Sequence, residues 1–458
     1  MVEWSGKRMN RFKEILSHLK WYDYTILGIL IALFWFLFLF PADLWHTTNC
    51  SLAYVNGHFS DFYQYNAQAY TRLDYYPLIY VIYAIWNIPL GLMGIGAFAA
   101  DNTAILLYEK VLGCLFMISA TIPFYLISRK IGLNAKAAVY TTFLFLTTPY
   151  IFLSTFAWGM YDSINVFFLL FGLYFFFREK KKSDILFAML FFGLSFSIKL
   201  IPAFIIIPLV AYKYKNVFKL AGLYLLSLVP LAIQILLYSG SAAFTGSALG
   251  SSEFISRLIG MSVGNSWHII AIYIVVWACV CFFAYFADYE PGNPIKPLYI
   301  CLLAATAFLC CIEWHPQWFI LLAPFSVWTT AMHKKRNRFY IFDIALTCMW
   351  LAVTWVVFPN FEEGALQSGG LHGLFANVAE PFVSTSLLPG QFLQGYLGVM
   401  TAVLIISAVL KNPWKYKEEY NAEFIPEKQD KLYAYGRFAA PVVFFLAPVL
   451  IWVVKILF

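Results

Sequence analysis

Residues 184–212 read DILFAMLFFGLSFSIKLIPAFIIIPLVAY, an apolar run that is interrupted in its middle by Lys199 and, three positions later, by Pro202. One long helix here would cross a membrane once, whereas two short helices meeting at the interruption would cross it twice. The number of crossings decides which side of the membrane every later basic cluster faces. The positions of Lys and Arg therefore decide between the two arrangements.

The composition indicates a membrane protein along the whole chain. Of its 458 residues 62% are hydrophobic and 12% are charged, and the mean hydropathy is +0.72. We predict an all-α polytopic membrane protein with about 13 transmembrane helices, within a range of about 11 to 14, and a helical first outer loop. The predicted spans are 24–40, 104–127, 137–157, 161–177, 184–198, 200–212, 218–238, 268–287, 298–312, 316–332, 339–358, 391–410 and 438–457.

Basic residues set the orientation of these spans. Most of the 31 Lys and Arg share one side of the membrane if 184–212 is split and if the apolar stretch 76–98 does not cross. Cytoplasmic loops carry an excess of Lys and Arg, so the N-terminus is predicted to be cytoplasmic. The loops 41–103 and 359–390 are then extracytoplasmic. The net charge of +7 is assigned to cytoplasmic loops that meet anionic lipid, not to a nucleic-acid partner.

Polar residues that can do chemistry collect on the extracytoplasmic side. The stretch SDFYQYNAQAY (60–70) predicts a short helix with Asp61, Gln64 and Tyr65 on one face. Asp61 at the helix start is a candidate general base, and its neighbours are candidate ligands for a polar substrate such as a sugar. An amphipathic helix on the membrane surface explains the same pattern and stays an alternative.

Two further charged residues lie at predicted helix ends on the same side. Asp162, in WGMYDS (158–163), lies within an apolar edge, where a carboxylate is costly unless it faces a cavity; an ordinary partner of the helix dipole is the alternative. Lys199 faces outward against the charge bias. A phosphate ligand would explain its placement, and snorkelling to the interface is the alternative.

A polar turn, EWHPQW (313–318), joins two apolar spans. His315 can donate to a phosphate or to an acceptor hydroxyl, and Glu313 can orient it. A hydrogen-bonded turn that merely contains a histidine accounts for the sequence equally well.

The order and common sidedness of these motifs resemble the GT-C class of polytopic glycosyltransferases, which use polyprenyl- or dolichyl-phosphate sugars. Within that class the resemblance is to mannosyltransferases related to the GPI mannosyltransferases. DFYQY (61–65) followed by YYPL (75–78) is similar to the first-loop acidic motif and the Tyr-Pro-Pro-Leu-like element of the class, with Leu78 in place of the second proline.

Three later motifs extend the resemblance, which covers about residues 24–335. WGMYDS is similar to a Gly-Gln-Tyr/Phe-Asp turn, with Met160 in place of Gln. SIKLIP (197–202) resembles the lysine-containing segment of the class, and EWHPQ (313–317) resembles its late histidine-bearing turn.

The resemblance implies a GT-C-like membrane module over 24–335, preceded by a cytoplasmic segment 1–23 and followed by C-terminal helices 336–458. It implies an inverting glycosyltransferase that moves one sugar, mannose or glucose, from a polyprenyl-phosphate donor to a hydroxyl of a lipid-linked glycan or surface polymer. A bacterial plasma membrane is favoured over the endoplasmic reticulum. Membrane lipids are expected partners.

The resemblance also implies roles for the candidate residues. Asp61 is the expected base, and Lys199 and His315 are expected to offset the charge of the donor phosphate. One carboxylate base without a nucleophile predicts inversion of the sugar. No cofactor is expected, although a divalent Mg or Mn ion shared by two carboxylates stays open. The residues expected to contact sugar or acceptor are Asp162, Tyr65, Gln64, Gln317 and Glu313.

Two other functions stay open from the sequence. A lipid-linked sugar transporter or flippase also needs intramembrane polar residues and broken helices. A polysaccharide polymerase or ligase would share the lipid-linked donor.

Overall fold

The computed structural model describes residues 19–70, 73–98, 102–178, 180–249, 252–265, 268–358, 363–375, 390–421 and 425–457. Over these residues the chain is mostly helical, which confirms the all-α class. One feature was not predicted: β1 (Ser262–Asn265) and β2 (His268–Ala271) form an antiparallel hairpin before α15. Most of the segment 1–23 and of the loop 359–390 lies outside the described residues.

The first half of the chain supplies the helices that carry most of the candidate residues. They are α2 (Trp21–Leu37), α3 (Pro41–Val55), α4 (Phe62–Asn66), α5 (Pro77–Leu92), α6 (Thr103–Lys130), α7 (Ala135–Leu146), α8 (Pro149–Phe152), the π-helix η1 (Leu153–Ala157), α9 (Asp162–Arg178), α10 (Lys182–Ile198), α11 (Ile201–Lys213) and α12 (Val217–Tyr238).

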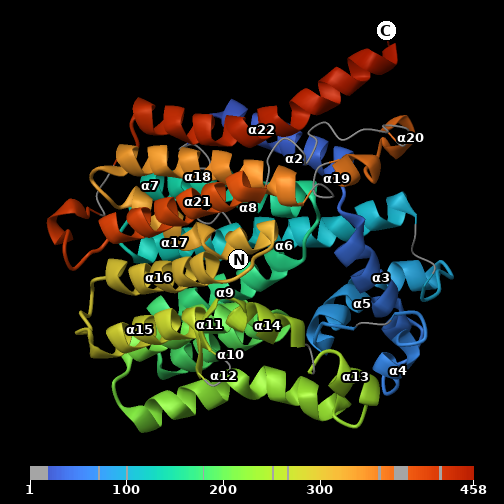
Figure 1. Ribbon diagram of the computed structural model, residues 1–458, viewed down its shortest axis with the longest axis horizontal. Coiled ribbons are helices and arrows are strands. Elements are labelled where there is room, and N and C mark those ends of the chain that lie inside the picture. The colour runs from blue at the N-terminus through green and yellow to red at the C-terminus, as the bar shows by residue number, and fades with distance from the viewer. Residues whose placement is uncertain are drawn as a thin grey trace, which may run out of the picture.

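The second half completes the bundle, whose longer helices run side by side in Figure 1. Its elements are α13 (Ala242–Gly246), α14 (Ser252–Gly260), α15 (Ile272–Phe286), α16 (Ile295–Cys311), the 3-10 helix η2 (Pro316–Leu321), α17 (Ala323–Ala331), α18 (Arg336–Val357), α19 (Glu363–Gln367), α20 (His372–Phe375), α21 (Gly390–Leu410), the 3-10 turn η5 (Lys417–Glu419) and α22 (Lys428–Leu457).

The apolar run 184–212 forms two helices, as predicted. α10 ends at Ile198, and Lys199 has extended backbone angles (φ −151°, ψ 129°). Pro202 lies in the first turn of α11, where its missing N–H costs no hydrogen bond. The chain therefore changes direction at Lys199, where α10 has ended and α11 is about to begin.

Two other apolar segments are bent at prolines. α2 and α3 meet at 78°, and α7 meets the α8–η1 segment at 56°. Pro41 begins α3 and Pro149 begins α8, and a proline in the first turn of a helix leaves no hydrogen bond of that helix unmade. The span predicted over 137–157 is therefore wrong as a single straight helix.

The segment 41–103, predicted as the first outer loop, is largely helical over its described residues. α3, α4, α5 and α13 lie together at one end of the bundle (Figure 1). Aromatic rings fill the space between them: Phe62 stacks on Tyr54 at 4.0 Å and packs against Tyr80 at 5.1 Å. Within the apolar stretch 76–98, α5 runs unbroken through Pro89 and ends at Leu92.

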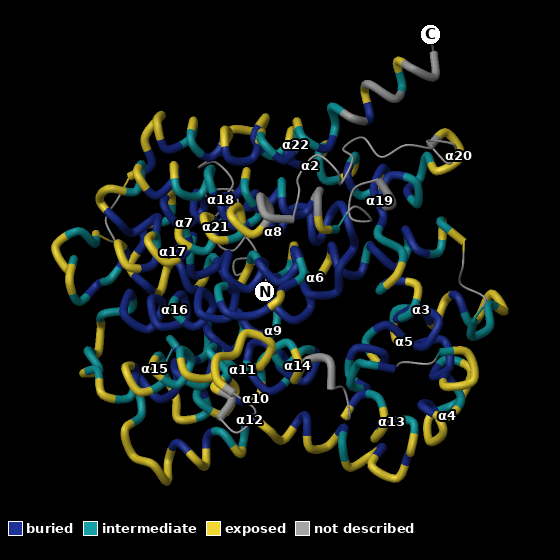
Figure 2. The backbone as a smooth tube through the Cα atoms, viewed as in Figure 1, coloured by how far each residue is buried: buried dark blue, intermediate teal, exposed yellow. Residues whose placement is uncertain are grey.

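The centre of the bundle is formed by α6, α9 and α10. α9 packs against both of its neighbours, and Figure 2 shows α6 and α9 as largely buried. α10 and α12 approach so closely that a Cβ on Gly193 would lie 2.3 Å from the carbonyl oxygen of Ser227. Small residues allow such close helix contacts.

The outer surface of the bundle is apolar. On α12 the side chains of Phe218, Leu225, Leu236 and Leu237 are strongly exposed. By length and hydropathy α6 and α12 can cross a membrane, and each of the two bent pairs described above qualifies if it is counted as one span. Several shorter apolar helices accompany them. These surfaces indicate a membrane-associated protein.

Candidate functional site

The centre of the candidate site is a buried ion pair between two helix starts. Asp162 begins α9, and Lys199 lies in the break between α10 and α11. The Lys199 Nζ atom lies 2.9 Å from Asp162 Oδ1, and the Asp162 side chain is only 1% exposed. A buried carboxylate is tolerated when it is paired in this way. The structure thus brings together two residues that the sequence analysis selected separately.

A second carboxylate, Asp43, joins this pair. It lies in the first turn of α3 and accepts a hydrogen bond from the Tyr75 hydroxyl (3.3 Å). The Tyr75 ring packs edge-on against Tyr161 at 5.1 Å, next to Asp162. The charges of Lys199 and Asp162 both act on Asp43.

Asp43 is electrostatically suited to hold a proton. α3 turns away from α2 by 78°, and Asp43 lies three residues after the end of the span predicted over 24–40. Burial raises the pKa of Asp43 above that of an ordinary aspartate, while Lys199 opposes the shift. A carboxylate with a raised pKa accepts a proton more readily near neutral pH.

Three nitrogen-bearing side chains collect around the ring of Trp318. Lys199 Nζ lies 5.5 Å and Arg257 Cζ 5.8 Å from the ring centroid, and the His315 ring lies 5.3 Å away, edge-on. Arg257 comes from α14, whereas His315 immediately precedes η2 and Trp318 lies within it. Cations near a tryptophan face are stabilised by the ring. Lys199, Arg257 and His315 can together receive an anionic group.

Two further residues of the EWHPQW turn, Gln317 and Glu313, have different surroundings. Gln317 is buried, and its Oε1 atom has no hydrogen-bond partner. Glu313 is exposed to solvent. Gln317, directly before Trp318 in the chain, thus has a buried Oε1 atom that accepts no hydrogen bond from the described residues.

Asp61 has a different environment. It precedes α4, is 54% exposed, and its Oδ2 atom lies 3.0 Å from His58 Nδ1. This hydrogen bond holds the pKa of Asp61 below its ordinary value. Tyr65 stacks on the same His58 at 3.6 Å and on Phe98 at 5.4 Å, and Gln64 is exposed. Asp61 and Tyr65 thus share His58 as a neighbour.

Sequence reasoning missed Asp43, Tyr75, Arg257 and Trp318 as members of the site. Asp43 carried the signal that selected Asp162, a carboxylate just after an apolar span with helix-start residues around it. Arg257 carried the signal that selected Lys199, a cation on the side poor in positive charge. Both signals are local, and only the fold shows that they converge.

Neither the family models nor the curated proteins contain a match to this chain. Within the described residues no group of three or more His, Cys, Asp or Glu side chains is arranged to hold a metal ion. The interpretation of the site therefore depends on its geometry and on the motif resemblance.

Proposed function

We propose that this protein is an integral-membrane inverting glycosyltransferase of GT-C type. It transfers one sugar, mannose or glucose, from a polyprenyl-phosphate donor to a hydroxyl of a lipid-linked glycan or surface polymer. The membrane is a bacterial plasma membrane. In this proposal about 13 of the apolar helices cross the bilayer, the N-terminus is cytoplasmic, and α3, α4 and α5 lie on the extracytoplasmic face.

One observation carries the proposal: two carboxylates and a lysine meet at three separate helix breaks, at the end of the bundle that the topology assigns to the outer face. Lys199 Nζ lies 2.9 Å from Asp162 Oδ1, and the charges of both residues act on the Asp43 carboxylate. Buried charged groups in membrane proteins mark sites of chemistry or transport. A base next to a cation is the set that transfer from a phosphate donor needs.

The proposed base is Asp43. As the acceptor oxygen bonds to the anomeric carbon, its proton passes to the Asp43 carboxylate, and the bond from that carbon to the phosphate oxygen breaks. The electron pair leaves with the lipid phosphate. One displacement without a covalent intermediate inverts the anomeric configuration.

The cations carry the other half of the reaction. The leaving phosphate gains negative charge, which Lys199 and Arg257 offset, with His315 as a hydrogen-bond donor. Trp318 offers a flat apolar face for the donor. Asp162 orients Lys199 through their ion pair. Gln317 and Glu313 remain proposed contacts for sugar or acceptor.

Asp61, predicted as the base from the sequence, remains the rival assignment. Its hydrogen bond with His58 makes it a weaker proton acceptor than Asp43. We assign Asp61, Gln64 and Tyr65 to acceptor binding at the rim.

The test is transfer of radiolabelled sugar from polyprenyl-phosphate mannose or glucose, in proteoliposomes that contain a mixed acceptor extract. Wild-type protein should transfer label from one of the two donors, whereas Lys199→Met and protein-free vesicles should not. Folded wild-type protein that transfers from neither donor would contradict the proposal and favour a transporter or an enzyme with another lipid-linked substrate.

A further inference from the structure

A second buried lysine, Lys110, lies close to the candidate site, and among the described residues no carboxylate pairs with it. It belongs to α6 and its side chain is fully buried. Its Nζ atom lies within hydrogen-bond distance of four backbone carbonyl oxygens, which its three N–H donors must share: Phe38 O at 2.5 Å, Ala157 O at 2.8 Å, Trp35 O at 2.9 Å and Phe34 O at 3.3 Å.

These carbonyls belong to two helix ends. Phe34 and Trp35 lie in the last turn of α2, Phe38 follows it, and Ala157 is the last residue of η1. The last carbonyls of a helix have no partner within the helix and carry its negative dipole end. A lysine Nζ atom placed between two such ends can donate to carbonyls of both.

The adjacent acidic residue does not share this role. Both carboxylate oxygens of Glu109 are buried without a hydrogen-bond partner. Among the described groups, the bonds of the Lys110 ammonium are thus to backbone oxygens. Its partners are fixed by the paths of α2 and η1.

Each of the two helix ends leads directly into one carboxylate of the candidate site. Asp43 follows Phe38 by five residues, in the first turn of α3, and Asp162 follows Ala157 by the same spacing, at the start of α9. The two breaks also touch each other, because the Phe40 amide donates to Trp158 O at 3.2 Å.

A glycine keeps the space that this arrangement needs. Gly159 has a φ of +79°, and a Cβ built on it would lie 2.9 Å from Lys110 Cγ. A residue with a side chain would therefore strain the backbone and push the lysine stem. The Lys110 side chain therefore packs directly against the backbone of Gly159.

We propose that Lys110 is a positioning residue, which ties the break before Asp43 to the break before Asp162 and so fixes the distance between the two carboxylates. This inference depends on the proposed function for its effect on catalysis. The predicted effect of Lys110 on the backbone does not depend on the proposed function.

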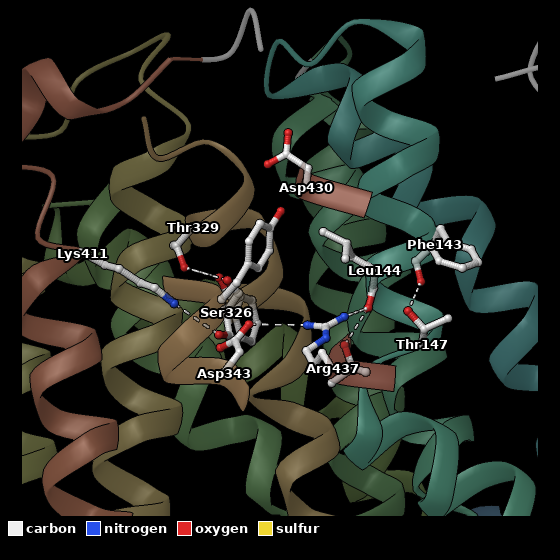
Figure 3. Close-up of polar contacts among 12 residues, drawn as sticks. Phe143, Leu144, Thr147, Ser326, Thr329, Asp343, Lys411, Asp430 and Arg437 are labelled. Carbon is white, nitrogen blue, oxygen red and sulfur yellow. Dashed lines mark hydrogen bonds and ion pairs between the residues drawn. The ribbon is translucent and has the colours of Figure 1, made fainter. Parts of the chain in front are cut away.

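The test compares Lys110→Met with Lys411→Met as a matched control. Lys411 is also almost fully buried, but it lies at the end of α21, at the opposite end of the bundle from α3, α4 and α5 (Figure 1). Figure 3 shows it beside Ser326, to which it donates at 3.3 Å, with Asp343 and Arg437 nearby. Both variants remove a buried ammonium, so a general loss of stability affects both.

Two readouts separate positioning from stability. The kcat for sugar transfer should fall about 100-fold in Lys110→Met, because a displacement of about 1 Å at reacting groups has that effect, while the donor KM changes less than about threefold. Hydrogen exchange of the Phe40 amide should become at least about 10-fold faster. Lys411→Met should change neither, and Lys110→Arg, which keeps the charge and the donors, should recover part of both.

If Lys110→Met cannot be obtained folded, Gly159→Ala replaces it, with a kcat about 10-fold lower and faster exchange at Phe40 expected. Wild-type values of kcat and exchange in the folded variant would overturn the proposal. If wild-type protein transfers no sugar, the glycosyltransferase assignment fails, and the exchange data alone then decide whether Lys110 holds the two breaks together.

Discussion

Asp43 and Asp61 belong to the same outer unit but have opposite environments. Asp43 is partly buried between α3 and the Asp162–Lys199 pair, and burial raises its pKa. Asp61 is 54% exposed, and His58 lowers its pKa. The comparison shows that position in a motif does not make a carboxylate a base. The surrounding charges and the degree of burial do.

Loss of Lys199 from its ion pair with Asp162 should give a large effect, comparable with loss of the proposed base. Lys199→Met leaves Asp162 buried and unpaired, and it removes a cation from the proposed phosphate site. We expect turnover to fall about 1000-fold and the free energy of unfolding to fall by about 3 kcal/mol. Turnover and thermal unfolding in the same detergent preparation measure both. A variant within tenfold of wild-type turnover would place the phosphate elsewhere.

Arg257→Gln should have a smaller effect, because Arg257 is partly exposed and shares the Trp318 ring with Lys199. We expect kcat/KM for the donor to fall about 10-fold. The decrease should shrink at high salt, since partly exposed charges are screened. An unchanged kcat/KM would show that Arg257 of α14 does not bind the donor.

The pH profile separates the two carboxylates by the sign of their pKa shifts. A base must be ionised, so activity is lost as the pH falls through the pKa of the base. With Asp43 as the base, the acid limb of kcat/KM lies above the ordinary aspartate pKa of about 3.9. With Asp61 it lies below that value. If Asp43 is the base, His58→Asn should leave the acid limb of kcat/KM at the same pH, because His58 acts on Asp61.

Stability should change in opposite directions in the two Asn variants. The folded state favours protonated Asp43, so its raised pKa costs stability above the ordinary pKa, and Asp43→Asn should raise the Tm at pH 7. Asp61 has a lowered pKa, so it contributes stability above its unfolded pKa, and this is lost as the pH falls through the folded pKa. Asp61→Asn should therefore lower the Tm slightly. Equal changes in Tm for the two Asn variants would contradict the opposite pKa shifts of Asp43 and Asp61.

Chelation should have the smallest effect. The proposed chemistry uses Lys199 and Arg257 in place of a metal ion, so EDTA should leave turnover unchanged within about twofold. A loss that Mg²⁺ or Mn²⁺ restores would show that Asp43 and Asp162 share a metal ion, and it would change the role of both.

Local sequence signals predicted much of the fold. The break at Lys199–Pro202, the start of α9 at Asp162 and the helical outer loop follow from short-range preferences of proline, charge and apolar pattern. The hairpin at 262–271 and the 3-10 start of the predicted span 316–332 did not follow. Apolar runs of this kind do not distinguish a strand or a 3-10 turn from the end of a helix.

The site was predicted only in part, for a physical reason. Asp162 and Lys199 were selected because each is a charge at an apolar edge, and the structure pairs them. The contribution of Asp43 depends on the 78° bend between α2 and α3, and that of Arg257 on the path of α14 to Trp318. These are contacts between distant segments, which no local pattern contains.

The central claim is that Asp43, and not Asp61, accepts the proton. The most direct test is turnover of Asp43→Asn and Asp61→Asn beside wild-type protein, with the same labelled donor and with folding checked by thermal unfolding. We predict a loss of about 1000-fold or more for Asp43→Asn and a change below about threefold for Asp61→Asn. Retained turnover in Asp43→Asn together with its loss in Asp61→Asn would contradict the assignment and move the base to the outer end of α4.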